Sequence, residues 1–189
     1  MRDHAANRIP DAPDEFWVLQ HYPVYTQGYS CHAMPSGSTQ IPVIATDRGG
    51  QMTYHAPGQL VIYLLLDLKR RRQGIRNLVS SIEMAIAQVL NVYHIDAGMR
   101  RDAPGIYVEG RKVASLGIRI KNGCTYHGMS LNVDMDTMPF EAIDVCGMRN
   151  LEVTTLRELG VVDGIETIAD KCVSSLADAL EYEICDRRR

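Results

Sequence analysis

One thiol in the sequence stands in a setting that suits a nucleophile. Cys146 precedes Gly147 in an irregular stretch after Pro139 and Phe140, where a thiol can be exposed and approached by backbone N–H groups. A catalytic thiol needs this access, together with a nearby cation or base that favours the thiolate. The other cysteines lack such a setting, because they fall on a helical apolar stripe, in a loop, after a turn and in the charged C-terminal tail (Cys172, Cys31, Cys124 and Cys185). Cys146 is therefore the first candidate for a catalytic nucleophile.

The candidate cation is Lys112, at the start of a strand. In strict alternation its same-face neighbours are Ala114, Leu116, Ile118 and Ile120, which puts its ammonium at the edge of an apolar surface. Removal from water disfavours the charged form of a lysine. A lysine that lays its stem on this surface and keeps its amine in water explains the pattern too, and the pattern alone favours that reading.

The densest group of polar residues and glycines lies at 48–59, which reads Arg-Gly-Gly-Gln-Met-Thr-Tyr-His-Ala-Pro-Gly-Gln. Paired glycines after a strand let backbone N–H groups approach a ligand closely. Thr53, Tyr54 and His55 add side-chain donors within the same few residues. A tight turn would explain a bare Gly-Gly pair, but this concentration of polar groups favours a binding site.

A zinc site is a weaker hypothesis. Cys124 and His127 are three residues apart, and His55, Cys31 and His32 lie elsewhere. The sequence has no Cys-x-x-Cys or His-x-x-His pair, which structural zinc sites usually supply. We therefore expect no metal.

The composition excludes several classes of protein. Lys and Arg number 20 against 23 Asp and Glu, so the net charge of -3 does not suggest a nucleic-acid binder. The longest apolar run, residues 60–66, is far shorter than the roughly 20 residues of a membrane-spanning helix, and the N-terminus has no apolar stretch of the signal-peptide kind. Five irregularly spaced cysteines suit free thiols in a reducing compartment. These features predict a cytoplasmic protein.

The hydrophobic pattern predicts the elements that must position these residues. Strands are expected at 16–21, 42–46, 60–68, 106–109, 112–120 and 129–135, and helices over 78–90 and from 163 onward. Asn122-Gly123 suits a type I′ turn, and Asp163 is expected to cap the second helix together with Glu166. The order predicts a mixed α/β (α+β) fold, with a largely antiparallel sheet flanked by helices. We expect a single domain over 15–189, after a polar N-terminal segment (1–14) that is either disordered or truncated.

Four blocks, in this order, resemble the octanoyltransferases of lipoate biosynthesis, also called lipoyl(octanoyl) transferases or lipoate-protein ligase B. They are residues 48–59, residues 110–117 (Gly-Arg-Lys-Val-Ala-Ser-Leu-Gly), residues 127–132 (His-Gly-Met-Ser-Leu-Asn) and Cys146-Gly147. The resemblance runs from about Glu15 to about Thr155, and it implies a fold similar to the catalytic domains of lipoate and biotin protein ligases. It also implies an acyltransferase that moves octanoyl from octanoyl-acyl carrier protein to a lysine of lipoyl domains, in 2-oxoacid dehydrogenases and the glycine cleavage H protein. That transfer is the first step of endogenous protein lipoylation.

The resemblance further implies roles for single residues. Cys146 matches the nucleophile that carries the acyl-thioester intermediate, and Lys112 matches the lysine that favours its thiolate. Three segments match those that line the acyl site: Arg48, Gly49, Gly50, Gln51, Met52, Thr53, Tyr54 and His55; Ser115, Leu116 and Gly117; Gly128, Met129 and Ser130. No cofactor is expected, because the acyl group arrives already activated.

Two alternatives stay open at this point. An ATP-dependent lipoate or biotin protein ligase has a similar fold and does not need the cysteine. A catalytically inactive module that binds an acyl carrier is the other. The basic cluster of residues 69–72 (Lys-Arg-Arg-Arg) with Arg76 is either a solvated face or a docking surface for acidic acyl carrier protein.

Overall fold

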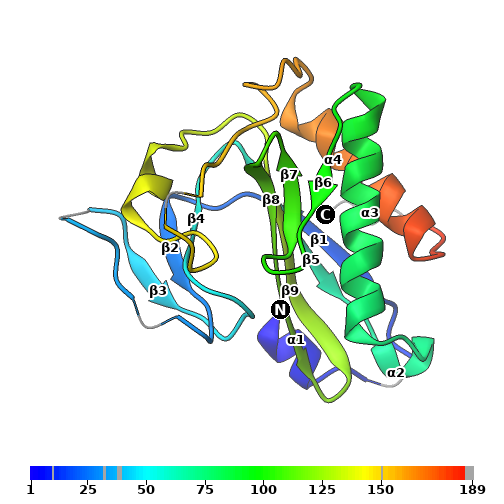
Figure 1. Cartoon of the computed structure of the whole chain (residues 1–189). Helices are drawn as coiled ribbons and strands as arrows, with labels where there is room; N and C mark the ends of the chain where they lie inside the picture. Colours follow the sequence, from blue (N-terminus) through cyan, green and yellow to red (C-terminus); the bar gives the residue numbers. More distant parts are fainter. Residues whose placement is uncertain (10, 32, 38–39, 150, 186–189) are drawn as a thin grey trace.

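The computed structural model describes residues 1–9, 11–31, 33–37, 40–149 and 151–185, and a six-stranded sheet forms its centre (Figure 1). The strands follow the order β1 (Glu15–Leu19), β5 (Gln59–Leu65), β9 (Cys124–Asn132), β8 (Arg111–Lys121), β7 (Gly105–Val108) and β6 (Gly98–Met99). Every neighbouring pair is antiparallel. The predicted mixed fold on a largely antiparallel sheet is confirmed.

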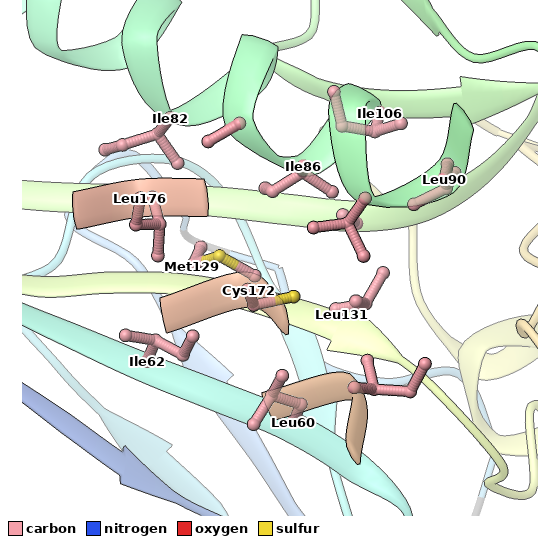
Figure 2. Packing of buried hydrophobic residues seen from close by; sticks show 14 of the residues in the cluster. Leu60, Ile62, Ile82, Ile86, Leu90, Ile106, Met129, Leu131, Cys172 and Leu176 are labelled. Carbon is pink, nitrogen blue, oxygen red and sulfur yellow. The ribbon is translucent and has the colours of Figure 1, made fainter. Parts of the chain in front are cut away.

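Helices α3 (Ile75–Val92) and α4 (Ile165–Ala179) cover one face of this sheet (Figure 1). The main core lies between them and the sheet, and Figure 2 shows side chains of both helices meeting those of β5 and β9. The sheet contributes alternate residues such as Leu60 and Ile62, and α3 contributes Ile82 and Ile86 at helical spacing. Each of these side chains stabilises the fold by about 1.5–3 kcal/mol through its burial.

A smaller sheet lies on the other side of the central one (Figure 1). In it β2 (Val24–Gln27) pairs in parallel with β3 (Val43–Ala45) and antiparallel with β4 (Thr53–His55). A second apolar cluster packs there, with Tyr54 edge-on to Phe140 of the 3-10 helix η1 (Met138–Ala142). Because Val145 is buried in the same cluster, this sheet also anchors the loop that carries Cys146. The sequence predicts β3 but misses β2 and β4, which are only four and three residues long.

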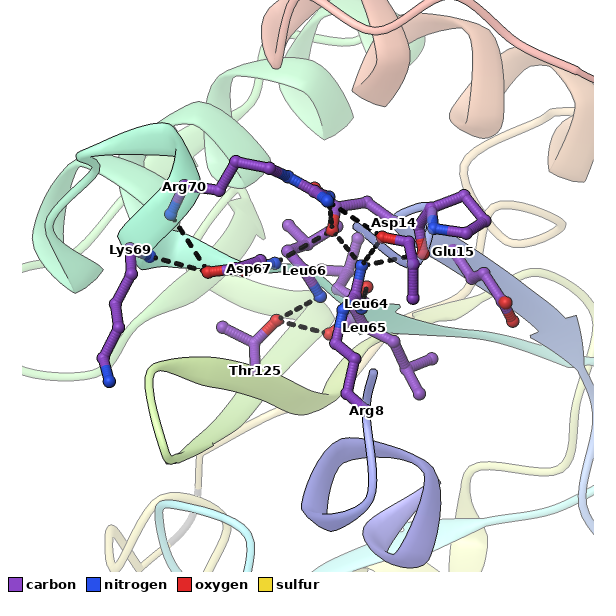
Figure 3. Close-up of polar contacts among 12 residues, drawn as sticks. Arg8, Asp14, Glu15, Leu64, Leu65, Leu66, Asp67, Lys69, Arg70 and Thr125 are labelled. Carbon is purple, nitrogen blue, oxygen red and sulfur yellow. Dashed lines mark hydrogen bonds and ion pairs between the residues drawn. The ribbon is translucent and has the colours of Figure 1, made fainter. Parts of the chain in front are cut away.

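The N-terminal segment is held by a buried ion pair (Figure 3). After α1 (Arg2–Ala6), the Arg8 guanidinium lies 2.5 Å from the Asp14 carboxylate, whose side chain is 3% exposed. Arg70 at the end of α2 (Leu68–Arg71) reaches the same carboxylate oxygen at 2.6 Å, and the Asp67 N–H donates to it. This segment therefore contains a short helix and a buried carboxylate, and its description as disordered or truncated stays a prediction. A domain boundary at residue 15 stays a prediction.

Two local predictions have opposite outcomes. Asn122 and Gly123 both have positive φ, as a type I′ turn between β8 and β9 requires. The predicted cap by Asp163 is wrong, because α4 starts after Gly164 and no side chain caps it. The Asp163 carboxylate instead accepts a hydrogen bond of 2.6 Å from the Tyr93 hydroxyl.

No helix within the described ranges is long and apolar enough to cross a membrane.

Candidate active site

Lys112 and Cys146, which are 34 residues apart in the sequence, meet in the structure. The Lys112 ammonium donates to the Cys146 Sγ at 3.2 Å. It also donates to the Pro104 carbonyl at 2.8 Å and to the Tyr107 hydroxyl at 3.0 Å. An ammonium has three hydrogens, so these three contacts use all of them. Lys112 is 1% exposed, and its charge is therefore directed at the sulfur rather than at water.

A β-bulge in β8 points Lys112 toward the cysteine. Ile106 of β7 pairs with Ala114, but the next residue, Tyr107, pairs with Lys112, so Val113 is an extra residue. Val113 and Ala114 both pack in the main core. The bulge thus reverses the side of the sheet on which Lys112 lies, and the prediction that Lys112 shares a face with Ala114 is wrong. The alternative interpretation, in which the Lys112 amine stays in water, is wrong as well, because Lys112 is buried.

Cys146 lies at the tip of a tight turn. The Gly147 and Met148 N–H groups donate to Asp144 and Val145 carbonyls, and Val145 is buried in the second core cluster. Cys146 itself has φ +56°, a left-handed conformation that is costly for a residue with a Cβ and that often marks functional sites. The turn leaves the thiol partly exposed, which a nucleophile needs.

Gly105 makes the space for the Lys112 side chain. A Cβ at this position would lie 2.6 Å from the Lys112 Nζ and 2.4 Å from the Ala114 carbonyl oxygen. The φ of Gly105 is +142°, which residues with a side chain rarely adopt. Only glycine fits here.

A cavity of about 650 Å³ opens beside the cysteine, a size typical of small-molecule sites. Strands of both sheets line it, and so does Cys146. The lining includes all but one of the residues predicted for the acyl site: Arg48, Gly49, Gly50, Gln51, Met52, Thr53, His55, Ser115, Leu116, Gly117, Gly128, Met129 and Ser130. Tyr54 is the exception, because its ring packs in the second core cluster. The cavity contacts place these residues together, while their roles stay predictions.

The Arg48 side chain turns inward and joins the start of the Arg48-Gly49-Gly50 segment to β2. Its guanidinium donates to the Thr26 hydroxyl, at 3.0 Å and 2.9 Å, and to the Thr26 carbonyl. Burial lowers the pKa of Arg48 to about 10, which still leaves it charged at neutral pH. The positive charge therefore lies in the wall of the cavity, where it attracts an anion or a carbonyl oxygen.

His55 is neutral in the folded protein. Burial lowers its pKa to about 4, and the Nδ1 lies 2.6 Å from the Gln59 side-chain oxygen. The Gln59 amide in turn donates to the Asn132 side chain at 2.9 Å. Neutral His55 donates from Nδ1, so this chain of hydrogen bonds ties β4 to β5 and β9.

We predict that His55 weakens the fold in acid. An unfolded histidine takes up a proton near pH 6.5, whereas folded His55 does not until about pH 4. Between these values the unfolded state binds more protons than the folded state. The free energy of unfolding should therefore decrease as the pH is lowered, by up to about 1.4 kcal/mol per pH unit. Denaturant unfolding of the wild type and a His55→Asn variant from pH 7 to pH 4.5 measures this. The variant should show a shallower slope, and the exposed His94→Asn should match the wild type; equal slopes for wild type and His55→Asn would contradict the prediction.

His127 has a partner other than zinc. Its Nε2 lies 3.0 Å from the Asp47 carboxylate, which also accepts from the Tyr126 hydroxyl at 2.7 Å. Burial raises the pKa of Cys124, which keeps that thiol protonated and a poor metal ligand. His32 lies outside the described residues.

Several residues of the site carry no sequence signal that we recognised. Pro104 and Tyr107 hold Lys112 only because a loop and a bulge bring them there. His21 and Tyr63 line the cavity and lie 2.6 Å apart through Nε2 and the hydroxyl. They come from separate segments, so spacing along the chain could not have paired them.

The chain is similar to a known protein family along most of its length. The family model described as the lipoyl protein ligase A/B catalytic domain matches residues 1–177. An octanoyltransferase of Nitrosospira multiformis is 48% identical over 184 residues, which cover 96% of this chain and 85% of that protein. The chain belongs to the octanoyltransferases of this family. An octanoyltransferase of Vibrio vulnificus is similar at 45% identity over 186 residues, covering 97% of this chain and 84% of that one.

Solved structures confirm the fold of this octanoyltransferase family member. Lipoate-protein ligase A bound with ATP superimposes with a TM-score of 0.79 at 14% identity, covering 98% of this chain and 80% of that one. Biotin protein ligase from Aquifex aeolicus is more distant, with a TM-score of 0.54 at 19% identity over 66% of this chain and 53% of that one. The resemblance inferred from the four sequence blocks is confirmed, and so is the conclusion that the chain is an acyltransferase.

Proposed function

We propose that this octanoyltransferase takes octanoyl from octanoyl-acyl carrier protein onto Cys146 and passes it to a lysine of a lipoyl domain. The observation that carries the proposal is the 3.2 Å contact between the Lys112 ammonium and the Cys146 sulfur at the wall of the cavity. An ammonium held there stabilises a thiolate, and a thiolate is the form of cysteine that attacks a thioester.

The first step exchanges one thioester for another. The Cys146 thiolate attacks the carbonyl carbon of the donor, the new Sγ–C bond forms, and the C–S bond to the carrier breaks. The carrier leaves as a thiol. The Lys112 ammonium can supply the proton across the site and becomes a neutral amine. The bonds broken and formed are alike, so the exchange is nearly isoenergetic.

The second step makes an amide. The amine of the acceptor lysine attacks the acyl-Cys146 carbonyl, Sγ leaves as a thiolate, and the excess proton of the amine returns to the neutral Lys112. An amide is more stable than a thioester, so this step draws the transfer forward. No ATP is consumed, because the acyl group is activated when it arrives.

Thr53 contributes a hydroxyl beside the cavity. The Thr53 Oγ1 is buried without a hydrogen-bond partner among the described residues, and Thr53 lines the cavity. An unpaired buried hydroxyl costs about 1–3 kcal/mol, which a bound carbonyl would recover. Thr53 is therefore a candidate donor to the acyl substrate.

The basic cluster is partly used within the protein. Arg70 binds Asp14, and Arg71 donates to the Leu180 carbonyl. Lys69, Arg72 and Arg76 are exposed, and these three are the residues we propose for docking the acidic carrier in the cytoplasm. Lipoyl domains of 2-oxoacid dehydrogenases and the glycine cleavage H protein are the proposed acceptors.

Intact-mass spectrometry tests the proposal. After incubation with octanoyl-acyl carrier protein and no ATP, the protein should gain the mass of one octanoyl group, and hydroxylamine should remove it. Adding a lipoyl domain should move the same mass to that domain. A parallel incubation offers lipoate and ATP. Modification of the lipoyl domain only in that second reaction would show an ATP-dependent ligase, and no adduct in either would show an inactive carrier-binding module.

A further inference from the structure

A buried carboxylate lies behind the catalytic pair. Glu83 belongs to the face of α3 that packs on the sheet, and it is only 9% exposed. Its neighbours on that face are apolar, including Ile82 and Ile86. A buried carboxylate is expensive unless a charge or a strong donor compensates it. Packing alone therefore does not explain a glutamate here.

The carboxylate connects to Lys112 through a single peptide group. The Glu83 Oε1 accepts a hydrogen bond of 2.8 Å from the Gly105 N–H. The carbonyl of the same peptide, that of Pro104, accepts the hydrogen bond of 2.8 Å from the Lys112 ammonium. A peptide group is planar and conjugated, so a negative charge at its N–H end makes its carbonyl oxygen a stronger acceptor. A chain of hydrogen bonds therefore runs from the Glu83 carboxylate through the 104–105 peptide and the Lys112 ammonium to the Cys146 sulfur.

We infer that Glu83 is a positioning residue that keeps Lys112 protonated and aimed at Cys146. The polarised Pro104 carbonyl accepts from the Lys112 ammonium more strongly, which stabilises the ammonium relative to the neutral amine. Without the Glu83 carboxylate, the proton between Lys112 and Cys146 would lie more on the sulfur, giving a neutral amine and a thiol. The inference rests on the proposed role of Lys112, and it assigns to α3 a function beyond packing.

The geometry of the peptide is fixed by Gly105. Its φ of +142° and the absence of a Cβ let the 104–105 peptide lie between α3 and Lys112. The Tyr107 hydroxyl completes the arrangement, because it accepts from Lys112 and donates to the Ala103 carbonyl at 2.8 Å. Both oxygen acceptors around the ammonium, the Pro104 carbonyl and the Tyr107 hydroxyl, are thus oriented by a further partner.

Other charges near the pair do not replace Glu83. Arg100 stacks on the Tyr107 ring at 5.4 Å, but its guanidinium is paired with Asp102 at 2.7 Å. Arg48 acts on Cys146 as a more distant positive charge. Asp102 is a carboxylate that lines the cavity, but it is exposed to solvent and paired with Arg100.

The test measures the reactivity of Cys146 with iodoacetamide against pH, followed by mass spectrometry of the Cys146 peptide. In Glu83→Gln the rate at pH 7 should fall by about tenfold, roughly the contribution of one charge-assisted hydrogen bond, and the midpoint of the profile should move to higher pH. In a Lys112→Met background the same substitution should have no further effect. Asp96→Asn, which neutralises an exposed carboxylate soon after α3, should leave the profile unchanged.

A midpoint that stays or moves to lower pH in folded Glu83→Gln would overturn the inference, and so would an equal effect in the Lys112→Met background. If Glu83→Gln does not fold, Glu83→Asp retains the charge with a shorter reach. It should then react between wild type and Lys112→Met, and a rate equal to that of Lys112→Met would count against the inference. Because alkylation needs no acyl donor, a failure here is distinguishable from a failure to form the octanoyl adduct.

Discussion

Replacing Cys146 by serine is expected to abolish the octanoyl adduct and to lower transfer to a lipoyl domain by on the order of 1,000-fold or more, as removal of other catalytic nucleophiles does. A serine hydroxyl at the same place cannot be ionised by an ammonium 3.2 Å away, because an alcohol is far less acidic than a thiol. The fold should survive, since the side chain is partly exposed and of similar size. Intact mass and the rate of lipoyl-domain modification measure both effects.

The matched control for this variant is Cys185→Ser. Cys185 is exposed, so it tests whether any accessible thiol can take the acyl group. Its adduct should equal that of the wild type. An undiminished adduct in Cys146→Ser, or one lost in Cys185→Ser, would place the thioester on another thiol and remove the basis of the proposed mechanism.

Much of this site could be read from the sequence because its parts are local. The glycine pair, the polar residues after it and the Cys146-Gly147 turn each occupy a few consecutive positions, and the structure brings them to one cavity. The central sheet follows from alternating apolar residues, and the hairpin between β8 and β9 from Asn122-Gly123. Such features depend on neighbours in the chain, so a sequence reveals them.

The features that could not be predicted depend on tertiary contacts. The bulge at Val113 reverses the side chain of Lys112, and no composition signal marks it. Tyr54 belongs to the polar segment, but its ring packs on Phe140 and forms part of the apolar cluster beside the small sheet. Asp163 has the spacing of a helix cap, yet the hydroxyl of Tyr93 competes for its carboxylate. In each case a partner distant in sequence overrides the local preference.

Substitution of Lys112 by methionine should lower the rate of acyl transfer by about 100- to 10,000-fold near neutral pH, the range that a positioned acid or base contributes. Methionine fills the buried space with an unbranched stem but offers no proton and no charge. The deficit should be largest at low pH and should shrink as the pH rises toward about 8.5, where an ordinary thiol ionises without help. The rate of adduct formation from pH 6 to pH 9.5 measures this profile.

Lys121→Met is the matched control, because Lys121 is an exposed lysine at the other end of the same strand, β8. Its rates should follow the wild type at every pH. Loss of the three hydrogen bonds from Lys112 leaves the Pro104 carbonyl and the Tyr107 hydroxyl without this donor, so a lower melting temperature in Lys112→Met is expected as well. A stability effect alone would reduce the rate equally across the pH range in which the protein stays folded. Only a deficit that closes as the pH rises identifies the ammonium as the group that generates the thiolate.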